Sequence, residues 1–272
     1  MATHQLSLLA IAISAFIVTT HAAPGADNII EFSYSGAKGP DKWGSLDPKF
    51  KTCSDGKAQS PINILHSKAA QGTNKTLSRN YIPATATLVN NGFNVGIHFE
   101  ENAGVIGVDG KDYSLQQIHW RTPSEHNING KAYDAELQLL HKADDGSVFM
   151  GAILYQIGNG DIVLAKIHRK LEELGREKCG GDEHARIDLG KLDPNPLRKC
   201  TRRYFRYQGS FTTPPCTENV IWHVFEKVRT ISKQQLELLK APMLPAFKSN
   251  SRPVQPDNGR QVVLNYDQRR KS

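Results

Sequence analysis

The sequence lacks the short motifs that identify several large protein classes. It has no Gly-rich phosphate-binding loop of either common type, no G-x-S-x-G nucleophile motif and no C-x-x-C pair. It therefore carries no signal of nucleotide binding, of an α/β-hydrolase, of a zinc ribbon or of a thioredoxin-type centre. It also has no repeat period and no Gly/Ser-rich or Pro-rich linker. Collagen-like and solenoid architectures are excluded, and one domain is expected.

Long apolar runs are also scarce. The longest, Leu6–Val18, has 13 uncharged residues, whereas a membrane-spanning helix needs about 20. Small residues around Ala22 follow it, as at the cleavage site of a signal peptide. Met1–Gln5, the segment before the run, has no Lys or Arg, which is atypical of a signal peptide. We expect residues 1–22 to be a secretory signal peptide and residues 23–272 to be the domain, with a buried N-terminal helix as the alternative. The protein should then be extracellular or vacuolar, without a membrane span.

Cysteines are few but even in number, at positions 53, 179, 200 and 216. In a secreted chain an even count indicates disulfides. Asn74-Lys75-Thr76 is a sequon for N-glycosylation, which attaches glycans to surface asparagines of such chains.

Acidic residues are outnumbered, with 27 Asp and Glu against 34 Lys and Arg and a formal net charge of +7. The excess gathers within 198–206 and at 269–271. No aromatic-interleaved nucleic-acid motif accompanies it, so a nucleic-acid partner is not expected. Cell-wall polyanions or acidic lipids are the candidate partners for this charge, and the oligomeric state stays open.

The recurrent pattern is short apolar runs separated by Asn-Gly or Asp-Gly pairs, which favour tight hairpin turns. The pairs are Asn91-Gly92, Asp109-Gly110, Asn129-Gly130 and Asp145-Gly146. The predicted strands are Ala84–Val89, Val95–Phe99, Tyr113–Trp120, Ala135–His141, Val148–Ile157, Arg203–Tyr207, Val220–Val228 and Gln261–Tyr266. Helical spacing appears only in Asp161–Lys178 and in Ser232–Ala241, where Ser232 and Gln235 could form a capping box. We therefore expect a mainly β domain with peripheral helices.

One pair of predicted strands carries a polar cluster. Side chains alternate faces along a strand, so His119 and Arg121 share one face of the first strand. Glu136 and Gln138 share one face of the next. The short connection with its Asn-Gly turn makes the two strands sheet neighbours. Taken alone, the cluster fits a solvated or salt-bridged face of the sheet.

Motifs along nearly the whole chain resemble α-class carbonic anhydrases, most closely the plant branch. They are Phe32-Ser33-Tyr34, Gly39-Pro40-Asp41-Lys42-Trp43-Gly44, Gln59-Ser60-Pro61-Ile62-Asn63-Ile64, Ile118-His119-Trp120, Pro123-Ser124-Glu125-His126, Gly209-Ser210-Phe211-Thr212-Thr213-Pro214-Pro215-Cys216 and Arg252-Pro253-Val254-Gln255-Pro256. The resemblance implies a single-domain α-carbonic anhydrase fold, a large, twisted, mostly antiparallel sheet with peripheral helices.

In that family three neutral histidines hold Zn²⁺, which activates a water for attack on CO₂. By resemblance the three ligand positions are His119, Arg121 and Gln138, so only the first is a histidine. Arginine stays protonated and has no lone pair to give, and an amide oxygen is a poor zinc ligand beside imidazole. Phe93 occupies the position of the family's proton-shuttling histidine. We therefore expect no zinc and little or no CO₂ hydration. The alternative is residual carbonate dehydratase activity through an atypical zinc arrangement.

The resemblance also assigns roles around this position. Gln117 and Glu136 match residues that orient metal ligands, and Glu125 and Thr212 match the pair that orients the zinc-bound hydroxide. The remaining matches are Thr213 and Trp222, which line the pocket, and His126 and His141, which pack beneath it.

The role of Arg121 is then the main point to decide about function. Without a metal, Glu125 and Glu136 need another counter-charge, because a buried unpaired charge is costly. We expect Arg121 to pair with one or both carboxylates. The alternative is that Arg121 forms a site for a small anion, such as bicarbonate or a carboxylate.

The resemblance pairs Cys53 with Cys216. A second bridge, Cys179–Cys200, is expected, with two free thiols as the alternative. Among family members the chain resembles the dioscorins, storage proteins of yam tubers that also lack the third ligand histidine. The predicted function is a storage or binding protein.

Overall fold

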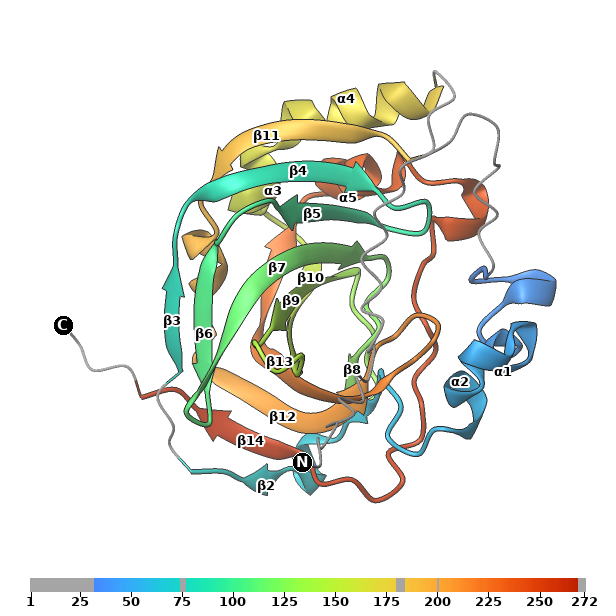
Figure 1. Cartoon of the computed structure of the whole chain (residues 1–272), viewed down its shortest axis with the longest axis vertical. Coiled ribbons are helices and arrows are strands. Elements are labelled where there is room, and N and C mark those ends of the chain that lie inside the picture. Colours follow the sequence, from blue (N-terminus) through green and yellow to red (C-terminus); the bar gives the residue numbers. More distant parts are fainter. Residues whose placement is uncertain (1–31, 74–76, 180–183, 200, 269–272) are drawn as a thin grey trace, which may run out of the picture. The chain divides into compact units, whose positions relative to one another are not determined.

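The computed structural model describes residues 32–73, 77–179, 184–199 and 201–268. The described residues form one 12-stranded sheet in the order β11-β4-β5-β7-β9-β10-β13-β12-β14-β2, with β6 beside β7 and β3 beside β6 (Figure 1). Its strands are β2 (Ala70–Gln71), β3 (Ser78–Tyr81), β4 (Ala84–Asn90), β5 (Val95–Phe99), β6 (Gly104–Val108), β7 (Lys111–Arg121), β9 (Ala135–Lys142), β10 (Val148–Ile157), β11 (Arg186–Leu192), β12 (Arg203–Ser210), β13 (Glu218–Ile231) and β14 (Val263–Tyr266). The expected mainly β fold is confirmed.

Pairing in this sheet is mostly antiparallel. The parallel pairs are β10 with β13 and β14 with β2. Each of the eight predicted strands coincides with a strand, and differences lie at the ends. The turn between β6 and β7 shows why Asp-Gly pairs predict hairpins. Asp109 and Gly110 have φ of 52° and 79°, the left-handed values that a two-residue hairpin turn needs.

Helices lie beside the β11–β4 end of the sheet (Figure 1). The predicted helix 161–178 is two helices, α3 (Ile162–Lys166) and α4 (His168–Cys179), because Ile167 leaves the helical region at φ −104° and ψ 10°. Asp161 caps α3 by accepting the N–H groups of Val163 and Leu164. The predicted capping box is present at the start of α5 (Lys233–Lys240). Two single-turn helices, α1 (Trp43–Leu46) and α2 (Thr52–Asp55), lie near the start of the described chain.

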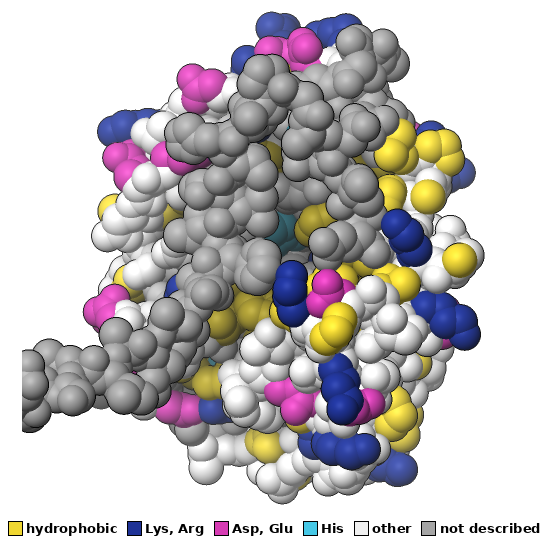
Figure 2. All heavy atoms as spheres, turned by 45° about the vertical axis from the view of Figure 1, so that its right-hand side comes forward, with side chains coloured by type: hydrophobic (Ala, Val, Ile, Leu, Met, Phe, Trp, Pro, Cys, Tyr) yellow, Lys and Arg dark blue, Asp and Glu magenta, His cyan; other side chains and the backbone are white. Residues whose placement is uncertain are grey.

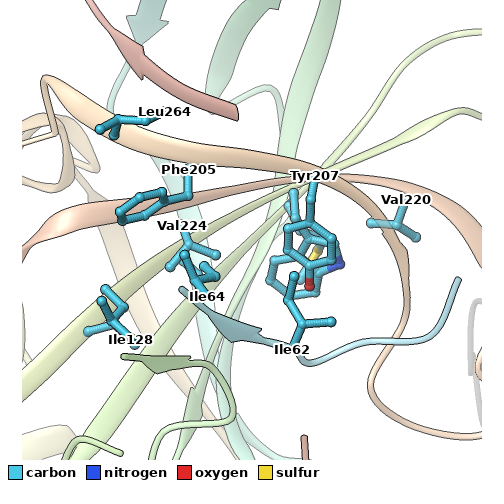
Figure 3. Close-up of a cluster of buried hydrophobic side chains, with 12 residues drawn as sticks. Ile62, Ile64, Ile128, Phe205, Tyr207, Val220, Val224 and Leu264 are labelled. Atoms are coloured by element: carbon cyan, nitrogen blue, oxygen red, sulfur yellow. The ribbon is translucent and has the colours of Figure 1, made fainter. Parts of the chain in front are cut away.

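A buried apolar cluster joins the large sheet to a two-stranded parallel sheet of β1 (Asn63–Ile64) and β8 (Asn127–Ile128). Figure 3 shows Ile62, Ile64 and Ile128 facing Phe205, Tyr207, Val220, Val224 and Leu264. This packing fixes the segment after β7, which carries part of the polar cluster. In the described part of the chain, no helix has the length and apolar character to cross a membrane.

Candidate functional site

The register of β7 and β9 brings the polar cluster together. His119 lies opposite Gln138, and Arg121 lies opposite Glu136, so the four side chains share one face of the sheet. Arg121, Glu136 and Gln138 are buried, whereas His119 is half-buried. The sequence alone suggested a solvated or salt-bridged face: the solvated form is wrong because these side chains are buried, and the contact between Arg121 and Glu125 agrees with the salt-bridged form. Buried groups of this kind must satisfy one another.

Arg121 lies between an aromatic hydroxyl and a carboxylate. Its Nη1 donates a hydrogen bond of 2.9 Å to the Tyr34 hydroxyl, and its Nε lies 3.6 Å from Oε2 of Glu125. The guanidinium carbon is 5.9 Å from the centre of the Phe93 ring. Burial alone would lower the pKa of Arg121, but Tyr34, Glu125 and Glu136 outweigh it and raise the pKa. Arg121 is a permanent buried cation.

Glu125 accepts hydrogen bonds from three directions. Its Oε1 accepts the backbone N–H of Arg252 at 3.0 Å, and its Oε2 accepts Nε2 of Gln138 at 2.7 Å. The Thr212 side chain is a third partner. Burial raises the pKa of Glu125, Arg121 opposes the rise, and the neighbouring Glu136 adds to it. This carboxylate is the more weakly ionised of the two.

Glu136 is held as a carboxylate. Its Oε2 accepts the backbone N–H groups of Glu125 and His126 at 3.0 and 2.8 Å, and its Oε1 lies 2.8 Å from Nδ1 of His126. Gln138 also donates to Oε1, at 3.0 Å. Burial would raise the pKa of Glu136, but His126 and these hydrogen bonds outweigh it and lower the pKa. The Gln138 amide thus bridges both carboxylates with its N–H groups.

A second buried guanidinium, that of Arg252, belongs to the site. Arg252 donates through Nη1 to Oε1 of Gln59 and to the Ser60 carbonyl, and through Nη2 to the Cys53 carbonyl, each at 2.8 Å. Burial lowers its pKa to about 10, so it stays charged at neutral pH. Arg252 therefore adds a second positive charge that interacts with Glu125 through space, while its guanidinium donates to neutral oxygen atoms. Arg252 and Tyr34 belong to motifs quoted from the sequence, but no local pattern assigned them to this site.

Other predicted site residues lie around this network. Gln117, expected to orient His119, lies opposite His98, and Nδ1 of His119 has no hydrogen-bond partner among the described residues. Phe93 packs against Phe32 with ring centres 5.2 Å apart. Thr213 is half-buried and its carbonyl accepts the N–H of Cys216.

Trp222 and the two histidines expected beneath the pocket are fully buried. Nε1 of Trp222 donates to the Ser210 carbonyl at 2.9 Å, and its ring centre lies 4.8 Å from that of His126. His126 contacts the Tyr207 hydroxyl through Nε2. His141 contacts the Tyr81 hydroxyl at 2.8 Å. Trp222 therefore supports the site from within the apolar cluster.

The donor set at this position does not fit a zinc ion. One imidazole, an amide whose N–H groups face carboxylates, and a guanidinium stand at the three positions where the family resemblance implies imidazole ligands, and neither the amide N–H groups nor the guanidinium offers a lone pair to Zn²⁺. Across residues 32–268, excluding the undescribed gaps, no three His, Cys, Asp or Glu side chains gather as a metal-binding group.

The disulfide Cys53–Cys216 is confirmed, with a Cα–Cα distance of 5.0 Å. Cys200 lies outside the described residues, so the pairing of Cys179 stays a prediction. The predicted signal peptide, Asn74 and the basic residues 269–271 also lie outside them.

The basic segment around residue 200 is partly neutralised. Nε of Arg203 lies 2.9 Å from Oε2 of Glu226, and Arg206 pairs with Asp109. On the face shown in Figure 2, the described Lys and Arg side chains are interspersed with Asp and Glu side chains. Binding of a polyanion by this segment remains a prediction.

A fully buried histidine, His141, and a half-buried one, His98, predict how stability depends on pH. Burial lowers the pKa of His141 to about 3 and that of His98 to about 4, from an ordinary 6.5. Below pH 6.5 the unfolded chain takes up protons that the folded chain does not. The stability they contribute is complete above pH 6.5 and is lost as pH falls toward 4, by about 1.4 kcal/mol per pH unit for each histidine.

Urea unfolding between pH 6.5 and pH 4 measures this effect. His141→Gln should reduce the slope of unfolding free energy against pH by about one proton. Gln116→Ala, an exposed position on β7 that carries no ionisable group, is the control and should leave the slope unchanged. An unchanged slope in His141→Gln would contradict the assignment.

Comparison with known proteins places the described fold in context. Residues 38–266 match the family model of eukaryotic-type carbonic anhydrases. Alpha carbonic anhydrase 7 of Arabidopsis thaliana is 39% identical over 237 residues, which cover 86% of this chain and 84% of that protein. Dioscorin dioA3 of Dioscorea japonica is 37% identical over 235 residues, 85% of each chain.

Two solved structures have the same fold. A dioscorin complexed with ascorbate superposes with a TM-score of 0.82 at 36% identity, covering 89% of this chain and 99% of that one. An α-carbonic anhydrase from Thermovibrio ammonificans, in complex with the inhibitor sulfanilamide, gives a TM-score of 0.76 at 33% identity, covering 85% of this chain and 98% of that one.

Proposed function

Because the chain belongs to the eukaryotic-type carbonic anhydrase family, we propose that it is a dioscorin-like member in which a buried ion-pair network stands where relatives hold zinc. It serves as a storage or binding protein and hydrates CO₂ weakly or not at all. Its similarity to dioscorins supports this proposal. So does one observation above all: Arg121 lies 3.6 Å from Glu125, while Gln138 donates to both carboxylates.

The network is incompatible with a dication for electrostatic reasons. A metal held by His119 would lie beside Arg121, whose raised pKa keeps it charged. Gln138 would have to turn its oxygen toward the metal and give up both N–H···O bonds. Turning the amide would leave Glu125 and Glu136 each short of a donor, and an unsatisfied buried polar group typically costs about 1–3 kcal/mol or more. The same residues that exclude zinc therefore satisfy the carboxylates.

The decisive experiment measures zinc content by elemental analysis together with CO₂ hydration. We expect substoichiometric zinc and turnover near background in the unmodified protein. Arg121→His combined with Gln138→His should restore zinc binding, since it recreates three imidazole donors. Arg121→Gln with Gln138 unchanged removes the cation without adding a ligand and is the matched control. Stoichiometric zinc with fast turnover in the unmodified protein would instead establish the alternative, an atypical zinc-dependent carbonate dehydratase.

Binding of a small anion is the second candidate function. The dioscorin structure with ascorbate bound supports it, at 36% identity to this chain, and Arg121 supplies a fixed positive charge. Ascorbate and bicarbonate are the probes, titrated by calorimetry. Loss of binding in Arg121→Gln would support an anion site at Arg121.

We also propose that the chain enters the secretory pathway through residues 1–22, leaving a domain of residues 23–272. Sequencing the N-terminus of the purified protein tests this directly. An N-terminus at Ala23 is expected, and one at Met1 would contradict it.

A further inference from the structure

A groove lies between the junction of α3 with α4 and the start of α5, at the end of the sheet where these helices gather (Figure 1). Its volume is about 450 Å³, and it is open to solvent. Sites for small molecules usually have about 300–1,000 Å³. The groove is therefore large enough for a ligand of that size, and it shares no residue with the network around Arg121.

One wall of the groove is basic. It is formed by Lys166, the last residue of α3, and by His168, Arg169 and Lys170 in the first turn of α4. Side chains three and four positions apart along a helical stretch lie about 5–6 Å from each other. No Asp or Glu is among the described residues that line the groove. Three permanent cations are thus spaced along one side of it.

Two of these three cations have no counter-charge. Lys170 is partly neutralised, because its Nζ lies 3.0 Å from Oε2 of Glu173. Lys166 and Arg169 are exposed, and neither forms an ion pair with any carboxylate in the part of the chain that the structure describes. The groove therefore keeps a net positive charge that a ligand can neutralise.

The opposite wall is neutral, polar and fixed in place. Oε1 of the buried Gln235 accepts the N–H of Asp161 at 2.7 Å, and its Nε2 donates to the Asp161 carbonyl at 2.9 Å. Oγ of Ser232 accepts the N–H of Gln235 at 3.1 Å, so its hydroxyl proton is left to donate. The exposed Gln234 adds an amide to this wall. These bonds tie the start of α5 to the start of α3, and a site built in advance binds at a lower entropic cost.

We propose that this groove binds a small polyanion, a molecule that carries several phosphate or carboxylate groups on a hydroxyl-bearing frame. A single small anion reaches only part of the basic wall, whereas acidic groups several ångströms apart meet Lys166, Arg169 and Lys170 together. Arginine binds phosphate and carboxylate with two parallel hydrogen bonds. The hydroxyl and amide groups of the opposite wall suit the hydroxyls of the frame. Inositol polyphosphates and short oligogalacturonates share this chemistry.

Calorimetric titration at a physiological ionic strength of about 0.15 M tests the groove. The probes are inositol hexakisphosphate and trigalacturonate, with inorganic phosphate and myo-inositol for comparison. We expect one equivalent of at least one polyanion to bind about tenfold or more tightly than inorganic phosphate, since each added charged hydrogen bond contributes a factor of that order. Myo-inositol should not bind. The tighter of the two polyanions identifies the acidic group that the groove prefers.

A pair of variants assigns the binding to the groove. Lys166→Gln combined with Arg169→Gln should weaken polyanion binding about tenfold or more. Lys57→Gln combined with Arg202→Gln removes the same charge from exposed positions outside the groove and should bind as the unmodified protein does. Near-ultraviolet circular dichroism establishes that both variants are folded.

Three results would overturn the proposal. They are the absence of saturable polyanion binding, binding of inorganic phosphate as tight as that of either polyanion, and equal affinities in the two double variants. Equal loss in both would mean that the polyanion responds to net charge alone. Arg121 and Gln138 are unchanged in these variants, so the outcome is independent of the zinc, hydration and ascorbate measurements.

Discussion

Replacing Arg121 by Ala is expected to lower the free energy of unfolding at pH 7 by about 3–5 kcal/mol, the usual cost of removing one partner from a buried ion pair. The substitution leaves Glu125, whose side chain is fully buried, without its nearest cation and close to a second carboxylate. The Tyr34 hydroxyl also loses its donor. Urea unfolding monitored by tryptophan fluorescence measures the change.

A double variant separates the ion pair from simple loss of packing. Adding Glu125→Gln to Arg121→Ala removes the unpaired charge while keeping the shape of the side chain. We expect the pair of changes to cost less than the sum of the single changes, with a coupling energy of about 0.5–3 kcal/mol. An unchanged unfolding free energy in Arg121→Ala would show that Arg121 is not a structural counter-charge. Reduced affinity for bicarbonate or ascorbate in that variant would then assign it to anion binding.

Part of this network could be predicted from the sequence because it depends on local geometry. Strand alternation places His119 with Arg121 and Glu136 with Gln138, and the short connection makes the two strands neighbours. The cross-strand pairing follows, as observed. The direction of the Gln138 amide could not be predicted, since it depends on how Glu125 and Glu136 are already hydrogen-bonded.

Long-range partners account for the rest of what the sequence did not show. Tyr34 is 87 residues from Arg121, and Arg252 is 127 residues from Glu125 and 193 from Gln59. No periodicity relates positions at such separations. A resemblance can mark the segments that contain them, but only the folded chain shows which charge each one balances.

The strands β6 and β11 were not predicted from the sequence, because they too depend on neighbours elsewhere in the chain. β6 contains two glycines in five residues, and glycine is depleted in strands. β11 lies at the edge of the sheet and is largely exposed, with a register shift beside Gly190. Both are held by their neighbours rather than by intrinsic propensity. The break between α3 and α4 at Ile167 likewise falls inside an uninterrupted helical pattern.

Removal of the disulfide by Cys53→Ala with Cys216→Ala should lower the free energy of unfolding by about 5 kcal/mol. The bridge joins residues 163 positions apart, and the chain-entropy model gives a cost of that size for such a loop. Both cysteines lie in a buried aromatic cluster with Phe32, Trp43 and Phe50. Their carbonyls accept hydrogen bonds from Arg252 and Gln59, so the bridge also anchors the second guanidinium of the site.

The same variant resolves the state of the other two cysteines. Urea unfolding without reductant gives the effect of removing Cys53–Cys216, and adding reductant to the variant then reports only on Cys179 and Cys200. We expect no free thiol in the denatured, unreduced variant and a further loss of about 3 kcal/mol on reduction, as the chain-entropy model gives for a loop of about 20 residues. Two free thiols, with no effect of reductant, would show that the second bridge does not form. A variant as stable as the unmodified protein would show that the long-range bridge constrains neither the unfolded chain nor the site.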